Sequence, residues 1–227
     1  MGEVEFLVTG PEGGPLLLLA HGAGAPMTSP FMETIAALLS ERGLASARFE
    51  FPYMAARRDG GKKRPPPKAE TLVPAYLDVI EQAKARWPAR TIIAGGKSMG
   101  GRVASLLASD ALGRGDIAGL VCLGYPFHPP GQSGQMRTGH LMVMSCPTLI
   151  VQGERDPFGL RGEVEALALP AAIGVHWAGD GDHDLGPRGG KGYTRKGNLA
   201  AAADAVVAFA NSHIAEANSG AGAARRS

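Results

Sequence analysis

The sequence predicts an α/β fold in which a mostly parallel, doubly wound sheet is flanked by helices. Three observations lead to this prediction. Apolar runs of strand length alternate with longer helical patterns along the 227 residues, as in successive βαβ units. Some runs are continuously apolar, which is typical of strands buried on both faces. Many of the 33 glycines stand where a strand-like run gives way to a loop. A chain of this length can bury a sizeable core, so we expect a single domain.

The strands are assigned from apolar, β-favouring runs that are bounded by turn residues. The run 15–20, Pro-Leu-Leu-Leu-Leu-Ala, is continuously apolar and is therefore expected to be buried on both faces. Strands are expected at residues 4–9, 15–20, 44–51, 91–95, 117–125, 147–153 and 173–177.

The helices are assigned from apolar residues that recur every three or four positions. In the segment 30–42, for example, Phe31, Ile35, Leu38 and Leu39 share one helical face. The last helix is rich in alanine and ends near His213. Helices are expected at residues 30–42, 72–86, 103–108, 162–169 and 198–213.

Two segments fall outside this alternation. Residues 57–68 combine Lys, Arg, Gly and Pro, so we expect an irregular loop that borders the pocket. Such a loop either attracts an acidic substrate or partner, or is simply a solvated, semi-rigid connection. Residues 218–227 are small and polar, and we expect a disordered tail over residues 215–227, after a single domain of residues 1–214.

The most informative motif is Gly96-Lys97-Ser98-Met99-Gly100, which lies between the strand 91–95 and the helix 103–108. A G-x-S-x-G in this context is the nucleophile elbow. The glycines allow the close backbone approach that a sharp strand-to-helix turn requires, so the Ser98 hydroxyl is presented above the sheet. Lys97 is expected to form a surface salt bridge rather than to take part in catalysis. A glycine-rich turn with an incidental serine is the alternative.

A nucleophilic serine needs a base and an orienting acid, and in this type of fold they follow the serine in the order acid, then histidine. Asp156 follows the strand 147–153 and is our candidate acid, because Asp-Pro places a short carboxylate rigidly. His183 follows the strand 173–177 and is our candidate base. The alternative acids are Glu154, Asp180, Asp182 and Asp184; the alternative histidines are His21, His128, His140, His176 and His213.

The loop after the strand 15–20 is the candidate oxyanion site. Its small residues, His21-Gly22-Ala23-Gly24-Ala25, let the backbone approach a substrate, and Gly22 is expected to contact it. The amides of Ala23 and Met99 are the expected donors to a tetrahedral oxyanion. His21 is expected to fix this loop through hydrogen bonds. An ordinary strand–loop–helix connection is the alternative.

A second loop could shape specificity. It follows the strand 117–125, and we expect Tyr125, Phe127 and His128 to line the acyl or alcohol site. The neighbouring prolines offer a simpler interpretation, in which this segment is only a rigid turn.

These stretches resemble the α/β-hydrolase superfamily, including dienelactone-hydrolase-like proteins. The chain resembles more closely the small hydrolase-like domain of a testis-expressed protein and of the third subunit of the non-specific lethal chromatin complex. The resemblance implies an α/β-hydrolase fold over nearly the whole chain. Dienelactone hydrolases use cysteine where this chain has Ser98, which favours acyl transfer from an ester, thioester or amide. The matching stretches are His21-Gly22-Ala23-Gly24-Ala25, Gly96-Lys97-Ser98-Met99-Gly100-Gly101-Arg102, Gly124-Tyr125-Pro126-Phe127-His128-Pro129 and Gly179-Asp180-Gly181-Asp182-His183.

Composition narrows the function further. The formal net charge of +2 gives no strong attraction to nucleic acid or to anionic membranes. Cys122 and Cys146 are expected to be buried small hydrophobes rather than a disulfide. With no signal or membrane-spanning pattern, we expect a cytoplasmic enzyme that needs no cofactor or metal. It would be a serine hydrolase of small acyl substrates; the alternatives are a non-catalytic interaction module and acyl transfer to an acceptor other than water. The sequence carries no signal for an oligomeric state.

Overall fold

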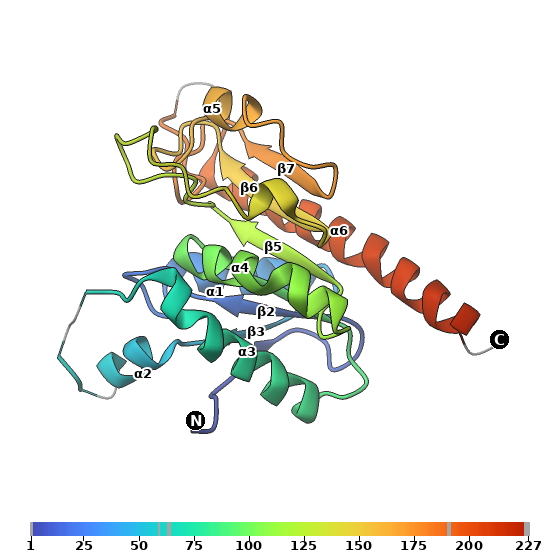
Figure 1. The fold of residues 1–227 in the computed structure, drawn as a ribbon. Helices are drawn as coiled ribbons and strands as arrows, with labels where there is room; N and C mark the ends of the chain where they lie inside the picture. Colours follow the sequence, from blue (N-terminus) through green and yellow to red (C-terminus); the bar gives the residue numbers. More distant parts are fainter. Residues whose placement is uncertain (1, 59, 63–64, 190–191, 225–227) are drawn as a thin grey trace.

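The computed structural model describes residues 2–58, 60–62, 65–189 and 192–224, with side chains in the last segment described through residue 212. Within these ranges, seven strands form one sheet in the order β1-β3-β2-β4-β5-β6-β7 (Figure 1). All neighbouring strands are parallel except β1 and β3, so the predicted, mostly parallel sheet is confirmed. The strands are β1 (Leu7–Thr9), β2 (Leu16–Ala20), β3 (Ala45–Phe49), β4 (Ile92–Lys97), β5 (Gly119–Leu123), β6 (Thr148–Gly153) and β7 (Ile173–Ala178).

Helices cover both faces of the sheet, as the doubly wound prediction requires. The helices α3 and α4 pack together on one face, and α1 and α6 pack together on the other (Figure 1). Shorter helices lie in the connections between strands. The helices are α1 (Pro30–Glu41), α2 (Pro52–Arg58), α3 (Ala69–Arg86), α4 (Met99–Gly113), η1 (Leu141–Val143), α5 (Arg161–Glu165) and α6 (Arg195–Ala224).

The apolar run in β2 explains how one sheet holds two cores. Leu16 and Leu18 belong to the core under α3 and α4, whereas Leu17 and Leu19 belong to the core under α1 and α6. Successive side chains of a strand point to opposite faces, so a strand between two helical layers must be apolar at every position. All four leucines are completely buried, and each contributes about 1.5–3 kcal/mol through that burial.

The helix α2 was not predicted from the sequence. It begins at Pro52 and runs through Arg58, into the segment that was expected to be irregular. Proline is favoured in the first turn of a helix because its fixed φ suits the helix and its missing N–H would have no partner there. The rest of the segment that the structure describes has no regular structure before α3 begins at Ala69; residues 59 and 63–64 lie outside the described residues.

The last helix is longer than the predicted helix 198–213. The helix α6 continues to Ala224 and extends beyond the sheet in Figure 1, where a disordered tail was expected from residue 215. Extending a helix that is already packed costs far less than starting one, so a weak helix-forming sequence can follow a strong one. Residues 225–227 lie outside the described residues. Although α6 has 30 residues, no helix in the described chain has the length and apolar character to cross a membrane.

Candidate active site

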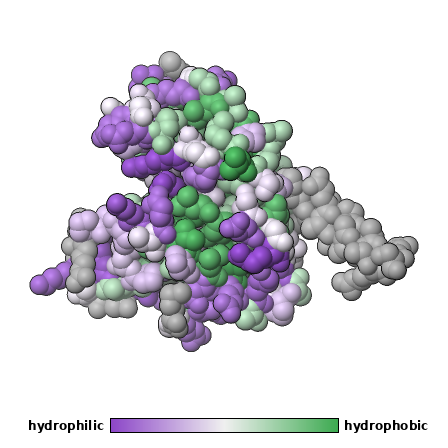
Figure 2. Space-filling view, in the orientation of Figure 1, coloured by the Kyte–Doolittle hydropathy of each residue, from purple (hydrophilic) through white to green (hydrophobic). Residues whose placement is uncertain are grey.

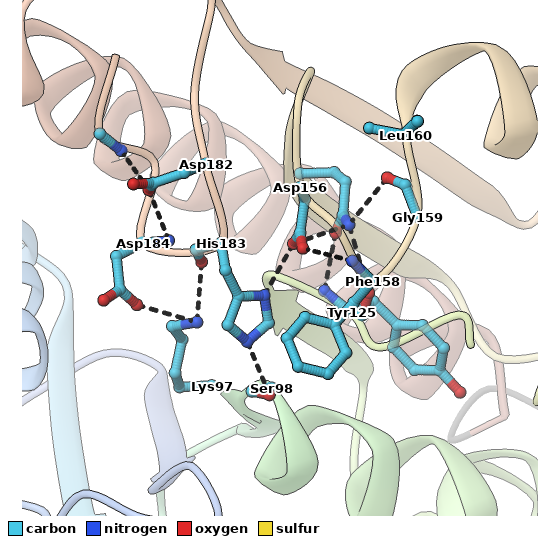
Figure 3. A network of polar contacts seen from close by, with 12 residues as sticks. Lys97, Ser98, Tyr125, Asp156, Phe158, Gly159, Leu160, Asp182, His183 and Asp184 are labelled. Atoms are coloured by element: carbon cyan, nitrogen blue, oxygen red, sulfur yellow. Dashed lines mark hydrogen bonds and ion pairs between the residues drawn. The ribbon is translucent and has the colours of Figure 1, made fainter. Parts of the chain in front are cut away.

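Three candidate residues meet at the carboxyl edge of the sheet. Ser98 directly follows β4, Asp156 lies in the turn after β6, and His183 lies in the loop after β7. Because these strands are parallel, their carboxyl ends lie at one edge, where ligands bind in open α/β sheets. Figure 3 shows His183 between the other two side chains, with Ser98 at the start of α4.

Backbone geometry presents Ser98. The residue has φ 51° and ψ −116°, a region that non-glycine residues rarely occupy. The turn can hold this conformation because the chain passes very close to itself. A Cβ on Gly100 would lie 2.6 Å from the carbonyl oxygen of His21, and one on Gly96 would collide with the backbone of Gly100. The two glycines of the motif are therefore required sterically.

Hydrogen bonds join the three side chains in one line. Ser98 Oγ lies 2.8 Å from His183 Nε2, and His183 Nδ1 lies 2.8 Å from Asp156 Oδ2. A carboxylate only accepts hydrogen bonds, so Nδ1 carries the proton and donates it to Asp156. In this tautomer Nε2 is unprotonated and accepts the Ser98 hydroxyl proton. The ring of Phe158 lies 4.4 Å from the His183 ring, centroid to centroid, and covers one side of it.

Asp156 is completely buried, and its carboxylate is held by donors other than His183. Its Oδ1 accepts the backbone N–H of Phe158 at 2.9 Å, and its Oδ2 accepts the side-chain amide of Gln152 at 2.9 Å. Gln152 in turn accepts the backbone N–H of Tyr125 at 2.7 Å, which fixes the direction of its amide. Gln152 was not predicted from the sequence. A fully buried polar residue within the apolar strand β6 was the signal that could have identified it.

Two of the alternative acids are engaged with arginines. Glu154 accepts from Arg161 at 2.8 Å and from the backbone N–H of Asp180 at 2.8 Å. Asp180 binds Arg188 at 2.8 Å, and this hydrogen bond holds the pKa of Asp180 well below its usual range. Both carboxylates therefore stabilise the loops around His183 and do not bind its ring.

The other two alternatives belong to the His183 loop itself. Asp182 Oδ1 accepts the backbone N–H groups of Asp184 and Gly186 at 2.9 and 2.8 Å, so it caps the turn. Asp184 Oδ1 lies 3.2 Å from Lys97 Nζ. Of the five carboxylates that the sequence offered, Asp156 is the one within hydrogen-bonding distance of the His183 ring in the described structure.

Lys97 corrects one expectation. It does pair with a carboxylate, but it is not a surface residue, because only 8% of its side chain is exposed. Its ammonium also donates to the carbonyl oxygen of His183 at 2.8 Å and lies 5.2 Å from the centre of the Phe31 ring. Burial lowers the pKa of Lys97, and the neighbouring Asp184 carboxylate opposes that effect.

His21 has the supporting position that the sequence predicted. Its Nε2 accepts the backbone N–H of Phe51 at 3.2 Å, so its Nδ1 carries the proton and donates to the carbonyl oxygen of Gly22 at 2.6 Å. Burial lowers the pKa of His21 to about 4, and the ring is therefore neutral at physiological pH. These contacts tie the start of the Ala23 loop to the strand end beside it.

The other candidate histidines do not bind Ser98 in the described structure. His140 bonds Ser105 of α4 at 2.8 Å, and His176 lies on β7. His128 bonds Glu163 at 3.1 Å. The side chain of His213 lies outside the described residues. Among the described histidines, His183 alone forms a hydrogen bond with Ser98.

The two expected oxyanion donors lie beside Ser98. Ala23 and Met99 both line the cavity that also contains Ser98. Within the described chain, neither backbone N–H donates a hydrogen bond to another protein group. Tyr53 donates its hydroxyl hydrogen to the carbonyl oxygen of Ala23 at 3.0 Å and so helps to hold that loop. Two amides without protein acceptors can therefore serve a negatively charged oxygen at this point.

Two cavities meet at Ser98 and Ala23. The first has a volume of about 470 Å³ and extends toward α3 and the loop after β5. Its wall includes residues 66–68, so the described end of the 57–68 segment borders the pocket as expected. The second has a volume of about 520 Å³ and is lined by Gly22, Phe31, Met32 and His183 among others. Figure 2 shows hydrophilic side chains over the loop after β5, at the upper left of that face.

The structure corrects the residues expected to line the site. Tyr125, Phe127 and His128 are 0%, 0% and 3% exposed, and none of them lines either cavity. The bond between the Tyr125 amide and Gln152 directs this segment inward, and the Tyr125 and Phe127 rings pack edge to face, 4.9 Å apart. Pro126 and Phe158 line the first cavity in their place.

The cysteines are buried free thiols, as expected. Burial raises the pKa of Cys146 to about 12 and also raises the pKa of Cys122, so neither is a reactive thiolate at neutral pH. Within the part of the chain that is described, no three His, Cys, Asp or Glu side chains are grouped to hold a metal ion.

Comparisons with known proteins agree with this architecture. A family model described as an alpha/beta hydrolase domain matches residues 14–211. An alpha-beta serine hydrolase homologue from Coxiella burnetii has a TM-score of 0.67 at 21% identity, over 90% of each chain. Est1E from Butyrivibrio proteoclasticus, with ferulic acid bound, has a TM-score of 0.67 at 17% identity, over 93% of this chain and 96% of that one. Dienelactone hydrolase from Anabaena variabilis has a TM-score of 0.69 at 17% identity, over 91% and 90%. At these identities the likeness is one of fold.

Proposed function

The chain belongs to the alpha/beta hydrolase domain family, and we propose that it is a serine hydrolase that cleaves an ester, thioester or similar acyl bond of a small substrate. The observation that carries this proposal is the line of hydrogen bonds from Ser98 through His183 to the buried Asp156. A hydrolase-fold protein that only binds partners would have no need to keep a carboxylate buried behind a histidine that faces a strained serine.

The first half-reaction follows from the tautomer of His183. Nε2 accepts the Ser98 hydroxyl proton while Oγ attacks the acyl carbon, and the carboxylate of Asp156 stabilises the resulting imidazolium. The acyl oxygen becomes negatively charged in the tetrahedral intermediate and accepts hydrogen bonds from the Ala23 and Met99 amides. Each such donor lowers the barrier by about 3–4 kcal/mol.

Collapse of the intermediate releases the alcohol or thiol and leaves an acyl group on Ser98. The imidazolium of His183 protonates the leaving atom, so we assign the leaving group to the cavity that His183 lines and the acyl group to the cavity beside Met99. A water molecule then attacks the acyl-enzyme, with His183 again as the base. Cavities of this size fit a small acyl group and a small leaving group.

The proposal is tested by labelling with a fluorophosphonate probe, which reacts with activated serines. We expect the wild-type protein to be labelled and the Ser98→Ala variant to remain unlabelled. Because serine and alanine differ by one oxygen, circular dichroism should be the same for both. Hydrolysis of short p-nitrophenyl esters and acyl thioesters, measured on the same two proteins, then distinguishes the substrate classes.

Either of two outcomes would contradict the proposal. A well-folded wild-type protein that takes no label and cleaves no ester would favour the non-catalytic interaction module. Labelling that persists in Ser98→Ala would show that the reactive nucleophile is another residue. If added alcohols or amines became acylated, Ser98 would catalyse acyl transfer to these acceptors as well as hydrolysis.

A further inference from the structure

Lys97 is a buried cation that the proposed reaction does not use. It lies inside the nucleophile turn, next to Ser98 in the chain, yet its side chain reaches the loop that carries His183. Its Nζ lies 2.8 Å from the His183 carbonyl oxygen and 3.2 Å from Asp184 Oδ1. Figure 3 shows these two contacts on the side of His183 away from Asp156. One side chain thus joins two segments that are far apart in the sequence.

We propose that Lys97 is a positioning residue, which holds the His183 loop at the distance from Ser98 that proton transfer requires. The inference rests on the proposed hydrolase function. The His183 ring is bound on one side by Asp156, whereas its backbone is bound on the other side by Lys97. Because Lys97 and Ser98 are consecutive, the Lys97 side chain joins the nucleophile turn directly to the backbone of the base.

Gly124 makes room for the contact between Lys97 and the His183 carbonyl oxygen. The backbone of Gly124 has φ +65°, and a Cβ there would lie 2.8 Å from the His183 carbonyl oxygen and 3.0 Å from Lys97 Nζ. An L-residue would therefore be strained at Gly124 and would crowd the hydrogen bond. Glycine at position 124, directly after β5, therefore leaves room for the hydrogen bond between the Lys97 ammonium and the His183 carbonyl oxygen.

Stability alone is a poor explanation for Lys97. Removing a lysine from water costs free energy that a single ion pair returns only in part, and an apolar side chain often serves as well in such a place. Asp184 keeps 53% of its side chain exposed, so its attraction is weakened by water. The charged groups around the ammonium are Asp184, Asp156 and Asp182. Arg195 lines the second cavity together with Lys97.

The test compares Lys97→Met, which keeps the length of the side chain but removes its donor and charge, with Asp184→Asn, which leaves the carbonyl contact intact. Lys84→Met is the matched control, because Lys84 lies on α3 and forms a 2.6 Å ion pair with Asp116, away from the site. Turnover of a short p-nitrophenyl ester is divided by the number of serines that a fluorophosphonate titrates. This normalisation removes any effect of unfolded protein.

We expect Lys97→Met to lower kcat per titrated site about 10- to 100-fold with a smaller change in KM, since small misplacements of a reacting group have effects of this size. Asp184→Asn should cause a smaller loss, and Lys84→Met none. Wild-type kcat per site in Lys97→Met would overturn the proposal.

A second readout does not depend on turnover. The His183 Nδ1–H, which donates to Asp156, should give a downfield proton signal in the NMR spectrum. We expect that signal to broaden through faster exchange with water in Lys97→Met, less so in Asp184→Asn, and not in Lys84→Met. If the wild type proves inactive, the proposed function fails. The Nδ1–H signal would still test whether Lys97 positions His183. If Lys97→Met does not fold, Gly124→Ala decides, because its methyl group would crowd the contact between Lys97 and the His183 carbonyl oxygen; an unchanged signal there would overturn the inference.

Discussion

The two halves of the candidate site are held in different ways. Ser98 is placed by its own backbone, because Gly96 and Gly100 let the chain pass close to itself at the turn. His183 is placed by side chains from elsewhere, with Asp156 binding its ring and Lys97 binding its carbonyl oxygen. The position of the nucleophile therefore depends on tight backbone packing of the turn against itself and against the end of β2. The position of the base depends instead on side-chain hydrogen bonds from distant segments.

This difference has a consequence for substitutions. A local steric arrangement fails when volume is added, since there is nowhere for a new atom to go. A network of side-chain hydrogen bonds fails when a donor or acceptor is removed, since the remaining partner is left buried and unsatisfied. The nucleophile side should thus be sensitive to size, and the base side should be sensitive to polarity at constant size.

The largest effect is expected at the base side. Asp156→Asn keeps the volume but lets the new amide donate to His183, which favours the wrong tautomer of the imidazole. We expect kcat to fall by about 10⁴-fold, as for the corresponding change in other serine triads, while the fold is retained. Steady-state hydrolysis of an activated ester measures this.

Asp182→Asn is the matched control for that experiment. The oxygen of its amide can still accept the N–H groups of Asp184 and Gly186, so the turn should persist and activity should change by less than about threefold. If Asp182→Asn abolished activity and Asp156→Asn did not, the assignment of the acid would have to be exchanged.

An intermediate effect is expected at the nucleophile side. In Gly100→Ala the added methyl group would lie 2.6 Å from the His21 carbonyl oxygen and 2.7 Å from that of Ala20. We expect a loss of about 1–3 kcal/mol in the free energy of unfolding, from urea denaturation. Labelling by the fluorophosphonate should fall as well, because Ser98 moves with the turn. Gly113→Ala, where a Cβ meets open space, is the control; equal stability of the two variants would contradict the steric argument.

The smallest effect concerns the loop that supports the nucleophile turn. His21 has a pKa of about 4 in the folded protein and about 6.5 when unfolded, so the unfolded chain binds more protons between these values. Stability from the neutral ring is fully present above pH 6.5 and is lost as the pH falls toward 4. Between pH 7 and pH 5 this should lower the free energy of unfolding by about 2 kcal/mol.

The variant His21→Gln isolates this contribution. Its side-chain oxygen can accept the Phe51 N–H, but it does not titrate in this range. The difference in unfolding free energy between pH 7 and pH 5 should therefore shrink by about 2 kcal/mol relative to the wild type. An unchanged difference would show that other groups cause the acid sensitivity.

Much of the architecture could be predicted from local patterns. The continuous apolar run of β2 indicated a strand between two helical layers, and alternation of strands and helices indicated a parallel sheet. The G-x-S-x-G motif identified the turn, since its chemistry is steric and lies within five consecutive residues. The order of motifs along the chain identified Asp156 and His183 as candidates, because parallel strands bring their carboxyl ends to one edge.

Other features had no local signal. Tyr125 and Phe127 looked like pocket residues after a strand, but a hydrogen bond to Gln152, 27 positions away, turns them into the core. Lys97 looked like a surface charge, because nothing in its neighbours reveals that the loop of His183 folds over it. The choice among five nearby carboxylates was equally nonlocal: four of them are bound to other partners.

The sequence by itself determined the sheet, the two cores and the strained serine, because burial on both faces and close backbone approach leave a direct mark on which residues are allowed. Only the tertiary structure decided which carboxylate meets His183, which side chains line the cavities and how deeply Lys97 is buried. The physical reason is that hydrogen bonds between loops depend on distances across space of a few tenths of an ångström, and such distances are set by the packing of the whole sheet rather than by neighbours in the chain.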